Sequence, residues 1–390
     1  MSRFVYADNA ATAKLSQTAL DAMLPWLKEG YGNPSSVYRL GREARRALDG
    51  ARDQVAAAIG AKPEEILFTG SGTEADNWAI RGLCEKLREK GRHIITSAIE
   101  HHAVSHTLEA LEKQGFEVTY LSVDSCGRVS VEDVKAAIRP DTILITIMFA
   151  NNEIGTIQPI AEIGAIAREH GIFFHTDAVQ AAGHVPVDVG AMHIDLLALS
   201  AHKFGGPKGV GALYVRKGIK LPSFITGGGQ EKGRRAGTEN VAGIVGMAAA
   251  LTEAVAHMDE NRAKVEALRD KLIAGMLQIP AVRLTGDPVN RLPGNASFVV
   301  ECVEGEAMIL MLDAQGIAAS SGSACSSGAL DPSHVLLAIG LPHEHAHGSV
   351  RFSLGEANTE ADVDYILEKM PPIAAKLRAM SPLWEERADD

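Results

Sequence analysis

The sequence has little cysteine, no long apolar run and no excess of positive charge. Its four cysteines are Cys84, Cys126, Cys302 and Cys325, and no two of them form a CxxC pair. This spacing argues against both a disulfide framework and a four-cysteine zinc site. The net charge of −11 argues against the basic surface that nucleic-acid and membrane-surface binders need. No apolar run reaches the roughly 18–20 residues of a membrane span, and no secretory signal is visible. We therefore expect a cytoplasmic protein that binds neither nucleic acid nor membrane.

The composition is that of a globular protein, since 46% of the 390 residues are hydrophobic and 22% are charged. Up to about residue 255, short apolar runs alternate with helical patterns that end at glycine. We expect strands at Glu64–Gly70, His93–Ala98, Glu117–Val123, Thr142–Ala150, Ile172–Ala178, Leu196–Ala201 and Gly211–Arg216, and helices at Ala75–Gly91, Val104–Gly115 and Ile160–Gly171. This alternation predicts an α/β fold with a doubly wound, mainly parallel sheet. Such sheets bind ligands beyond the carboxyl ends of their strands.

The pattern changes near residue 255, where we place a domain boundary. The elements expected there are a long helix at Ala248–Leu277, a strand at Asn295–Val303, a helix at Glu306–Gln315 and a strand at Ser349–Leu354. Residues 15–255 would form a large domain, and residues 1–14 and 256–390 a smaller α/β domain. We expect residues 1–14 to return to the small domain or to a subunit interface.

A glycine-rich turn, GSGTEA at residues 70–75, stands between an expected strand and an expected helix. The free backbone amides and the dipole at a helix N-terminus suit a phosphate group. The turn also fits the loose dinucleotide pattern GxGxxA, so a nicotinamide enzyme is a rival interpretation. A third interpretation is a plain tight turn capped by Thr73.

Polar residues follow two later strands. Asp177 ends one strand, where a carboxylate can hold a protonated ring nitrogen or a ribose hydroxyl, or simply cap a helix. Lys203 follows the next strand within SAHK, and partial burial would lower its pKa and free its amine to condense with a carbonyl. A phosphate turn, an aspartate and a lysine at strand ends match the needs of pyridoxal phosphate (PLP): a Schiff base, a protonated ring nitrogen and a phosphate site. A nicotinamide cofactor needs no such lysine.

At this point the chain resembles a known family, the NifS/IscS cysteine desulfurases, which are PLP enzymes of the aspartate-aminotransferase fold (fold type I). The motifs that carry the resemblance, which spans nearly the whole chain, are YADNAAT (Tyr6–Thr12), GNPSS (Gly32–Ser36), EHHAV (Glu100–Val104), NNEIGTIQP (Asn151–Pro159), HTDAVQ (His175–Gln180), SAHK (Ser200–Lys203), GGGQEKGRRAGTEN (Gly227–Asn240), SSGSACSSG (Ser320–Gly328) and VRFSLG (Val350–Gly355). The sequences of the segments RRAGTEN, AHGSVRFSLG and SPLW resemble the NifS branch more closely than the IscS branch.

The resemblance implies an L-cysteine desulfurase that releases L-alanine and carries the sulfur on Cys325 as a persulfide. It further implies a homodimer that hands the sulfur to a NifU- or IscU-like scaffold for iron–sulfur cluster assembly, including nitrogenase assembly in the NifS branch. No metal is expected in catalysis, and the one metal role considered is Cys325 as a transient iron–sulfur ligand.

The resemblance also assigns roles to residues. Lys203 bears the cofactor and removes the substrate Cα proton, His101 stacks on the ring and shuttles protons, and Cys325 attacks the substrate sulfur. The residues implied in cofactor binding are Gly72, Thr73, His101, Asn152, Asp177, Gln180, Ser200, His202, Lys203 and, from the other subunit, Thr238. Arg351 would bind the substrate carboxylate, because a guanidinium fork fits that group, and Asn33 would lie near the substrate.

Alternative functions remain open. A selenocysteine lyase would share the cofactor residues but depend less on Cys325. An aminotransferase would need a keto-acid acceptor and no thiol, and a sulfur carrier without catalysis would leave Lys203 unexplained. The small residues around Cys325 indicate an exposed loop, whereas Cys84 is expected in the core, Cys126 in a turn and Cys302 in a structural position.

Three alternating histidines, His343, His345 and His347, raise the possibility of a zinc site. No fourth ligand is apparent near them in the sequence. We therefore expect a solvated loop at this position.

Overall fold

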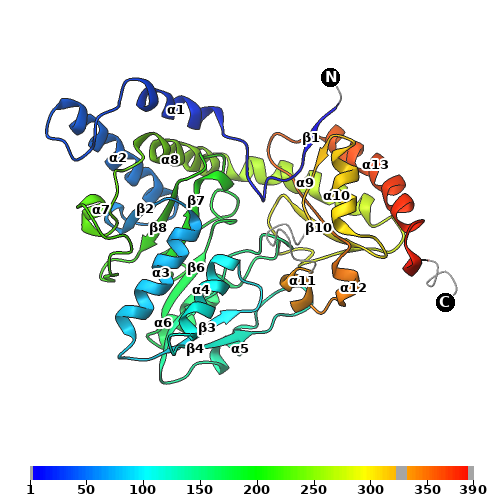
Figure 1. Cartoon of the computed structure of the whole chain (residues 1–390), viewed down its shortest axis with the longest axis horizontal. Coiled ribbons are helices and arrows are strands. Elements are labelled where there is room, and N and C mark those ends of the chain that lie inside the picture. Colours follow the sequence, from blue (N-terminus) through cyan, green and yellow to red (C-terminus); the bar gives the residue numbers. More distant parts are fainter. Residues whose placement is uncertain (1–2, 322–331, 385–390) are drawn as a thin grey trace.

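The computed structural model describes residues 3–321 and 332–384. A seven-stranded sheet lies at the centre of its larger part (Figure 1). Its strand order is β2-β8-β7-β6-β5-β3-β4. The strands are β2 (Ile66–Thr69), β3 (His93–Ser97), β4 (Glu117–Leu121), β5 (Thr142–Thr146), β6 (Phe173–Asp177), β7 (Leu196–Ser200) and β8 (Gly211–Val215). All seven predicted strands are confirmed. The sheet is mainly parallel, as predicted, but β8 is antiparallel to both β2 and β7.

Helices cover both faces of this sheet. The helices of the larger part are α1 (Gln17–Lys28), α2 (Arg39–Ala58), α3 (Gly72–Leu87), α4 (His102–Glu112), α5 (Val131–Ala136), α6 (Ile160–Glu169), α7 (Gln230–Gly233) and α8 (Val241–Ala256), with 3₁₀ turns η1 (Pro63–Glu65) and η2 (Ala201–Lys203). Along β7 the side chains alternate: Leu196 packs with α3 and α4, whereas Leu197 packs with α2, α6 and α8. This period of two explains why the strands are apolar throughout.

The predicted long helix is two helices. The chain bends by 72° between α8 and α9 (Met258–Met276), because His257 adopts a non-helical backbone with φ −106° and ψ 12°. Within the described residues no single helix is long and apolar enough to cross a membrane, and only this bent pair reaches that length and composition. The domain boundary near residue 255 stays a prediction, which the bend at His257 supports.

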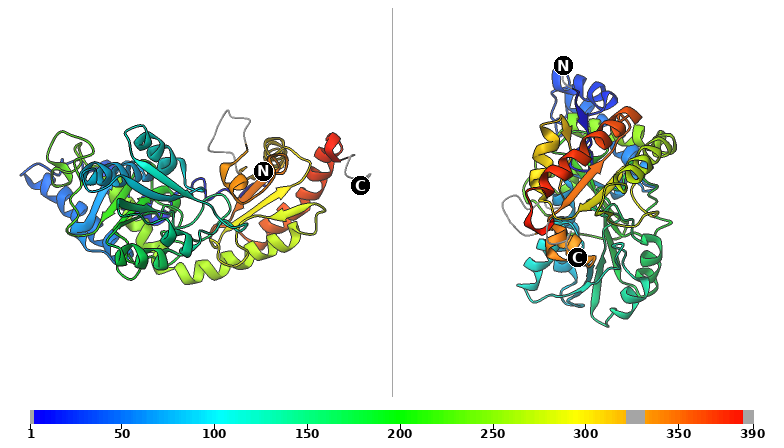
Figure 2. Two further views of the ribbon diagram at one scale, coloured as in Figure 1. Left: turned by 90° about the horizontal axis from the view of Figure 1, so that it is seen from below. Right: turned by 90° about the vertical axis from the view of Figure 1, so that its right-hand side faces the viewer.

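The remaining chain forms a smaller layered unit with its own apolar core. Its elements are β1 (Val5–Tyr6), β9 (Val282–Leu284), β10 (Asn295–Val300), β11 (Ile317–Ala318), β12 (Ser349–Ser353), α10 (Gly305–Asp313), α11 (His334–Ala338), α12 (His343–Ala346) and α13 (Glu360–Arg378). An antiparallel sheet of order β12-β10-β9 packs against these helices, and β1 pairs with β11. The N-terminal strand thus pairs with a strand of this unit, and Figure 2 shows α9 running from the larger part toward the smaller.

The histidine-rich segment differs from expectation. His343 begins the short helix α12 instead of lying in a loop, because the preceding Pro342 has a φ of −57° that suits a helix start. His345 Nδ1 lies 2.6 Å from an Arg283 guanidinium nitrogen. Among the residues described, no group of three or more His, Cys, Asp or Glu side chains could hold a metal ion.

The cysteines within the described residues lie where expected. Cys84 is buried in α3, and burial raises its thiol pKa to about 12. Cys126 lies in a turn in which its backbone N–H donates to the Asp124 carboxylate. Cys302 follows β10 with its thiol 3.5 Å from the Leu383 carbonyl oxygen. Cys325 lies outside the described residues.

Candidate active site

The N-terminus of α3 has free backbone amides that can bind an anion. Ser71, rather than Thr73, caps the helix, and its hydroxyl accepts a hydrogen bond from the Glu74 N–H at 3.1 Å. Gly72 allows close packing here, since an added Cβ would lie 2.6 Å from Val179 Cγ2. The first amides of any helix lack intrahelical acceptors. Those of Gly72 and Thr73, which both line the adjoining cavity, therefore suit a phosphate.

A carboxylate at this end is neutralised by an arginine. The Gly70 N–H donates to Glu74 Oε2 at 2.7 Å, and Arg235 donates to both Glu74 oxygens at 2.8 and 3.1 Å. The hydrogen bond to Glu74 raises the pKa of Arg235. This pair ties the segment 227–240, which also contains Thr238, to the helix start. Sequence reasoning did not find it, because the two residues are 161 positions apart.

One cavity of about 330 Å³ collects most of the predicted site residues. It lies at the carboxyl ends of β6 and β7, as expected for this kind of sheet. The predicted residues that line it are Gly72, Thr73, His101, Asn152, Asp177, Gln180, Ser200, His202, Lys203 and Arg351. Asn33 and Thr238 do not line it. Both are exposed, and the Asn33 side chain accepts a hydrogen bond from the nearby Ser35 N–H.

The N-terminal segment holds Lys203. Its Nζ donates to the carbonyl oxygens of Ala10 at 2.7 Å and Ala11 at 2.9 Å. The amide of Gln180 also donates to the Ala10 carbonyl, at 2.9 Å. The motif YADNAAT therefore contributes backbone acceptors to the site. Its side-chain pattern gave no sign of this role, since any residue carries a carbonyl.

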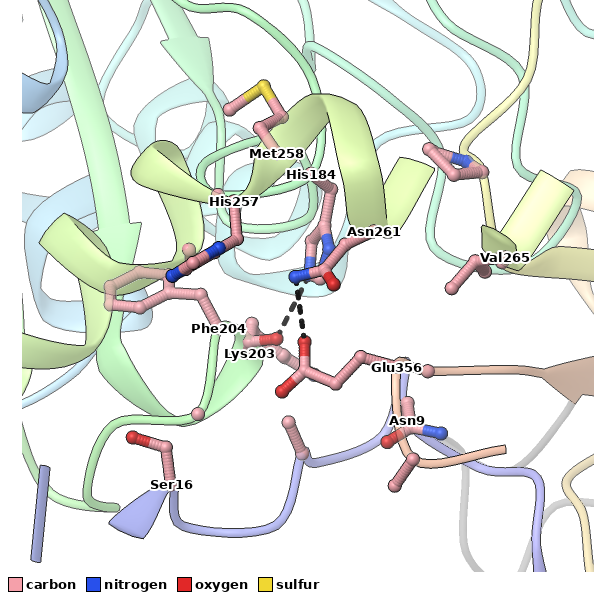
Figure 3. Close-up of a pocket in the computed structure, with 18 of the residues that line it drawn as sticks. Asn9, Ser16, His184, Lys203, Phe204, His257, Met258, Asn261, Val265 and Glu356 are labelled. Carbon is pink, nitrogen blue, oxygen red and sulfur yellow. Dashed lines mark hydrogen bonds between the residues drawn. The ribbon is translucent and has the colours of Figure 1, made fainter. Parts of the chain in front are cut away.

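A second cavity, of about 350 Å³, is also lined by Lys203 (Figure 3). There the half-buried His184 places Nε2 3.1 Å from the Lys203 carbonyl oxygen. Because a carbonyl only accepts, the Nε2–H of His184 is the donor. Burial lowers the pKa of His184, so the ring is a neutral donor that fixes the lysine's backbone.

Asp177 and His101 both line the cavity of about 330 Å³, which we call the cofactor cavity. Burial raises the pKa of Asp177, whereas His101 and Lys203 act to lower it. The Val179 N–H donates to Asp177 Oδ1 at 2.9 Å. His101 caps α4 by accepting the Ala103 N–H on Nδ1 at 3.1 Å, and burial lowers its pKa. The neutral ring therefore carries its proton on Nε2.

His202 contributes a neutral imidazole next to the lysine. Burial and the charge of Lys203 lower the pKa of His202 to about 4. Its Nδ1 lies 3.1 Å from the Thr12 hydroxyl. A neutral ring that donates a hydrogen bond suits a phosphate oxygen without adding charge.

The guanidinium of Arg351 has hydrogen-bond partners at Nη1 and Nη2 but not at Nε. Its Nη1 donates to the Asn152 carbonyl oxygen at 2.8 Å and its Nη2 to Asp8 Oδ1 at 2.9 Å. Its Nε is buried and has no hydrogen-bond partner among the described residues. The Nε edge of the fork therefore remains for a carboxylate ligand. Nearby Glu153 also lines the cavity, and burial raises its pKa to about 7.

The donor set fits PLP: a helix N-terminus for phosphate, a carboxylate for the ring nitrogen and a lysine held between them. These features define a PLP enzyme with an α/β fold. The family model described as "Aminotransferase class-V" matches residues 5–366, and the chain belongs to this family. Its fold is therefore the aspartate-aminotransferase fold, and its cofactor is PLP.

Three relatives show which members of the family this chain is similar to. The cysteine desulfurase IscS of Methanosarcina thermophila is 57% identical over 98% of this chain and 95% of its own. The cysteine desulfurase IscS of Clostridium botulinum is 55% identical over 99% of this chain and 98% of its own. A solved NifS-like protein, 39% identical, covers 96% of this chain and 100% of its own with a TM-score of 0.91.

Proposed function

We propose that this protein is an L-cysteine desulfurase that converts L-cysteine to L-alanine and transfers the sulfur to Cys325 as a persulfide. One observation carries the proposal. Lys203, Asp177, the N-terminus of α3 and the free edge of Arg351 share a single cavity, in a chain that is 57% identical to a cysteine desulfurase.

Each residue has a task in this reaction. Arg351 binds the substrate carboxylate through Nε, while Asn152 and Asp8 keep its guanidinium in place. Lys203 removes the Cα proton as a free amine. Asp177 holds a proton on the ring nitrogen, and bound PLP supplies the electron sink that makes the Cα proton acidic. His101 lines the cavity, and its Nε2, which is not used in capping α4, can carry protons.

The sulfur step uses the thiolate of Cys325, which attacks the sulfur of the substrate. The substrate's Cβ–S bond breaks, an S–S bond forms on Cys325, and Cβ takes up a proton so that alanine leaves. No external oxidant or reductant is needed, because the substrate's sulfur is oxidised as its Cβ is reduced. The role of Cys325 rests on its motif and on the relatives.

The experiment for this function is mass analysis after incubation with L-cysteine without added thiol. The peptide that contains Cys325 should gain the mass of one sulfur atom, and the Cys126 peptide should not. Cys126 is the matched control because it is a partly exposed thiol in a turn. An unmodified Cys325 peptide with continuing alanine release would instead favour a lyase mechanism.

A homodimer is part of the proposal. Exposed apolar side chains gather on α1 and the segment after it: Leu27, Tyr31, Val37 and Tyr38 are 62%, 79%, 86% and 57% exposed. Such a patch is typical of an interface. In the proposed dimer Thr238, which is exposed in one chain, would reach the phosphate of the other, as the family resemblance implies. Val37→Glu should produce monomers in size-exclusion chromatography, and an unchanged dimer would refute this interface.

The destination of the sulfur and the compartment are also proposals. We propose delivery to a NifU- or IscU-like scaffold in the cytoplasm, with Cys325 as a transient iron–sulfur ligand and nitrogenase assembly as one use. The described cysteines are all free, which supports a reducing compartment. Loss of iron–sulfur enzyme activities on gene deletion, restored by wild type but not by Cys325→Ala, is the expected result.

A further inference from the structure

A second buried carboxyl, Asp76, lies in the cavity wall and has no task in the reaction described above. Asp76 is 1% exposed and lines the cofactor cavity from α3. Its Oδ1 lies 3.4 Å from Nε2 of His175, which is fully buried. Neither atom has a hydrogen-bond partner within residues 3–321 and 332–384. Each is therefore placed to be the partner of the other.

The strand geometry explains the position of this pair. His175 and Asp177 are two residues apart on β6, so their side chains lie on the same face of the sheet. That face is covered by α3, from which Asp76 projects. On β5, Thr146 is paired in register with His175, and its hydroxyl lies 2.8 Å from His175 Nδ1. His175 thus links Thr146 on one side to Asp76 on the other.

Burial favours the neutral form of both members of the pair. Burial lowers the pKa of His175 to about 3. Burial raises the pKa of Asp76 well above its usual value, and the negative charge of the neighbouring Asp177 raises it further. Glu100 is itself buried, which raises its pKa to about 8. In that neutral form a protonated Asp76 would donate to His175 Nε2, and His175 Nδ1–H would donate to the Thr146 hydroxyl.

We infer that Asp76 and His175 are positioning residues, a neutral pair that fixes the end of β6 and leaves Asp177 as the ionised carboxylate facing the cofactor ring nitrogen. The inference rests on the PLP site of the proposed function. An ionised Asp76 would place a second negative charge in the same buried wall and disfavour ionisation of Asp177. The 3.4 Å contact needs only a small movement to become a hydrogen bond, and polar contacts in catalytic sites commonly tighten on binding.

Infrared spectroscopy of the holoenzyme at pH 7 tests the protonation directly. The C=O stretch of a protonated carboxylic acid should be present in wild type and lose one component in Asp76→Asn. Glu100→Gln should remove a different component, and Glu43→Gln, at an exposed carboxylate, should remove none. An unchanged carboxylic-acid band in Asp76→Asn would overturn the inference. This readout needs no turnover, so it stays valid even if the substrate is not cysteine.

A pair of variants separates a neutral donor from a negative charge. Asp76→Asn keeps a neutral donor of the same shape and should hold the Kd for PLP within about twofold of wild type. Asp76→Leu removes the donor, leaves His175 unpaired and should weaken PLP binding about tenfold or more. Equal losses in both variants would show that the charge of Asp76 matters and would overturn the inference. If Asp76→Leu does not fold, the infrared result of Asp76→Asn still decides.

Discussion

A buried ion pair that does not line the cofactor cavity offers a quantitative test of how the segment 227–240 is held. Arg52 and Glu231 have side chains that are 8% and 3% exposed and lie 2.6 Å apart. The same Glu231 carboxylate accepts the Phe68 N–H at 3.1 Å, and Arg52 donates to the Ile66 carbonyl. Glu231 also has a φ of 45°, which a non-glycine residue adopts only when its surroundings hold it there.

Glu231→Gln should therefore lower the free energy of unfolding substantially. It leaves the Arg52 guanidinium buried without a counter-charge, and removing one member of a buried pair typically costs about 3–5 kcal/mol. The matched control is Glu43→Gln in the exposed pair Arg39–Glu43, with side chains 75% and 41% exposed, which should cost less than about 1 kcal/mol. Because the segment also carries Arg235 and Thr238, Glu231→Gln should speed PLP release as well.

Equilibrium urea unfolding followed by circular dichroism measures both free energies of unfolding. The double variant Arg52→Met/Glu231→Gln should recover part of the loss, since no unpaired charge remains buried. A Glu231→Gln variant as stable as Glu43→Gln would refute the reasoning, because it would mean that the pair contributes no more than a surface contact.

Three further predictions concern the site itself. Lys203→Ala should abolish the visible absorption of lysine-bound PLP, and retained absorption would contradict the assignment of this lysine. Thr238→Ala should raise the Kd for PLP in the dimer, so an unchanged Kd would count against a contact from the partner subunit. Burial raises the pKa of Glu153 to about 7 from 4.5, so the folded state keeps a proton that the unfolded chain loses. The free energy of unfolding should therefore fall as the pH rises between these values, and Glu153→Gln should flatten this fall in pH-dependent urea unfolding; a slope like that of wild type would contradict the account.

Periodicity was sufficient for the sheet but not for its details. All seven strands were predicted because those inside the sheet are buried on both faces and read as apolar runs. The antiparallel direction of β8 was missed, since direction depends on a short connection and not on the strand's composition. The break at His257 was missed because the helical pattern continues on both sides of one non-helical residue.

The site was predicted where residues belong to motifs at strand ends. Lys203 and Asp177 follow buried strands, a position that sequence alone can recognise. The buried polar pairs were not found, because charged residues are ordinarily exposed and a sequence gives no sign that Asp76 is buried. The carbonyl oxygens that hold Lys203 were missed for a different reason, since backbone acceptors have no residue-type signature.

The most direct test of the central claim is the yield of alanine and sulfide from L-cysteine under thiol reductant, with wild type, Cys325→Ala and Cys126→Ala side by side. The account predicts equal amounts of alanine and sulfide from wild type and from Cys126→Ala. Cys325→Ala should retain PLP but release neither product. Near-normal turnover of cysteine by Cys325→Ala would contradict a persulfide mechanism, and activity of that variant confined to selenocysteine would favour a selenocysteine lyase.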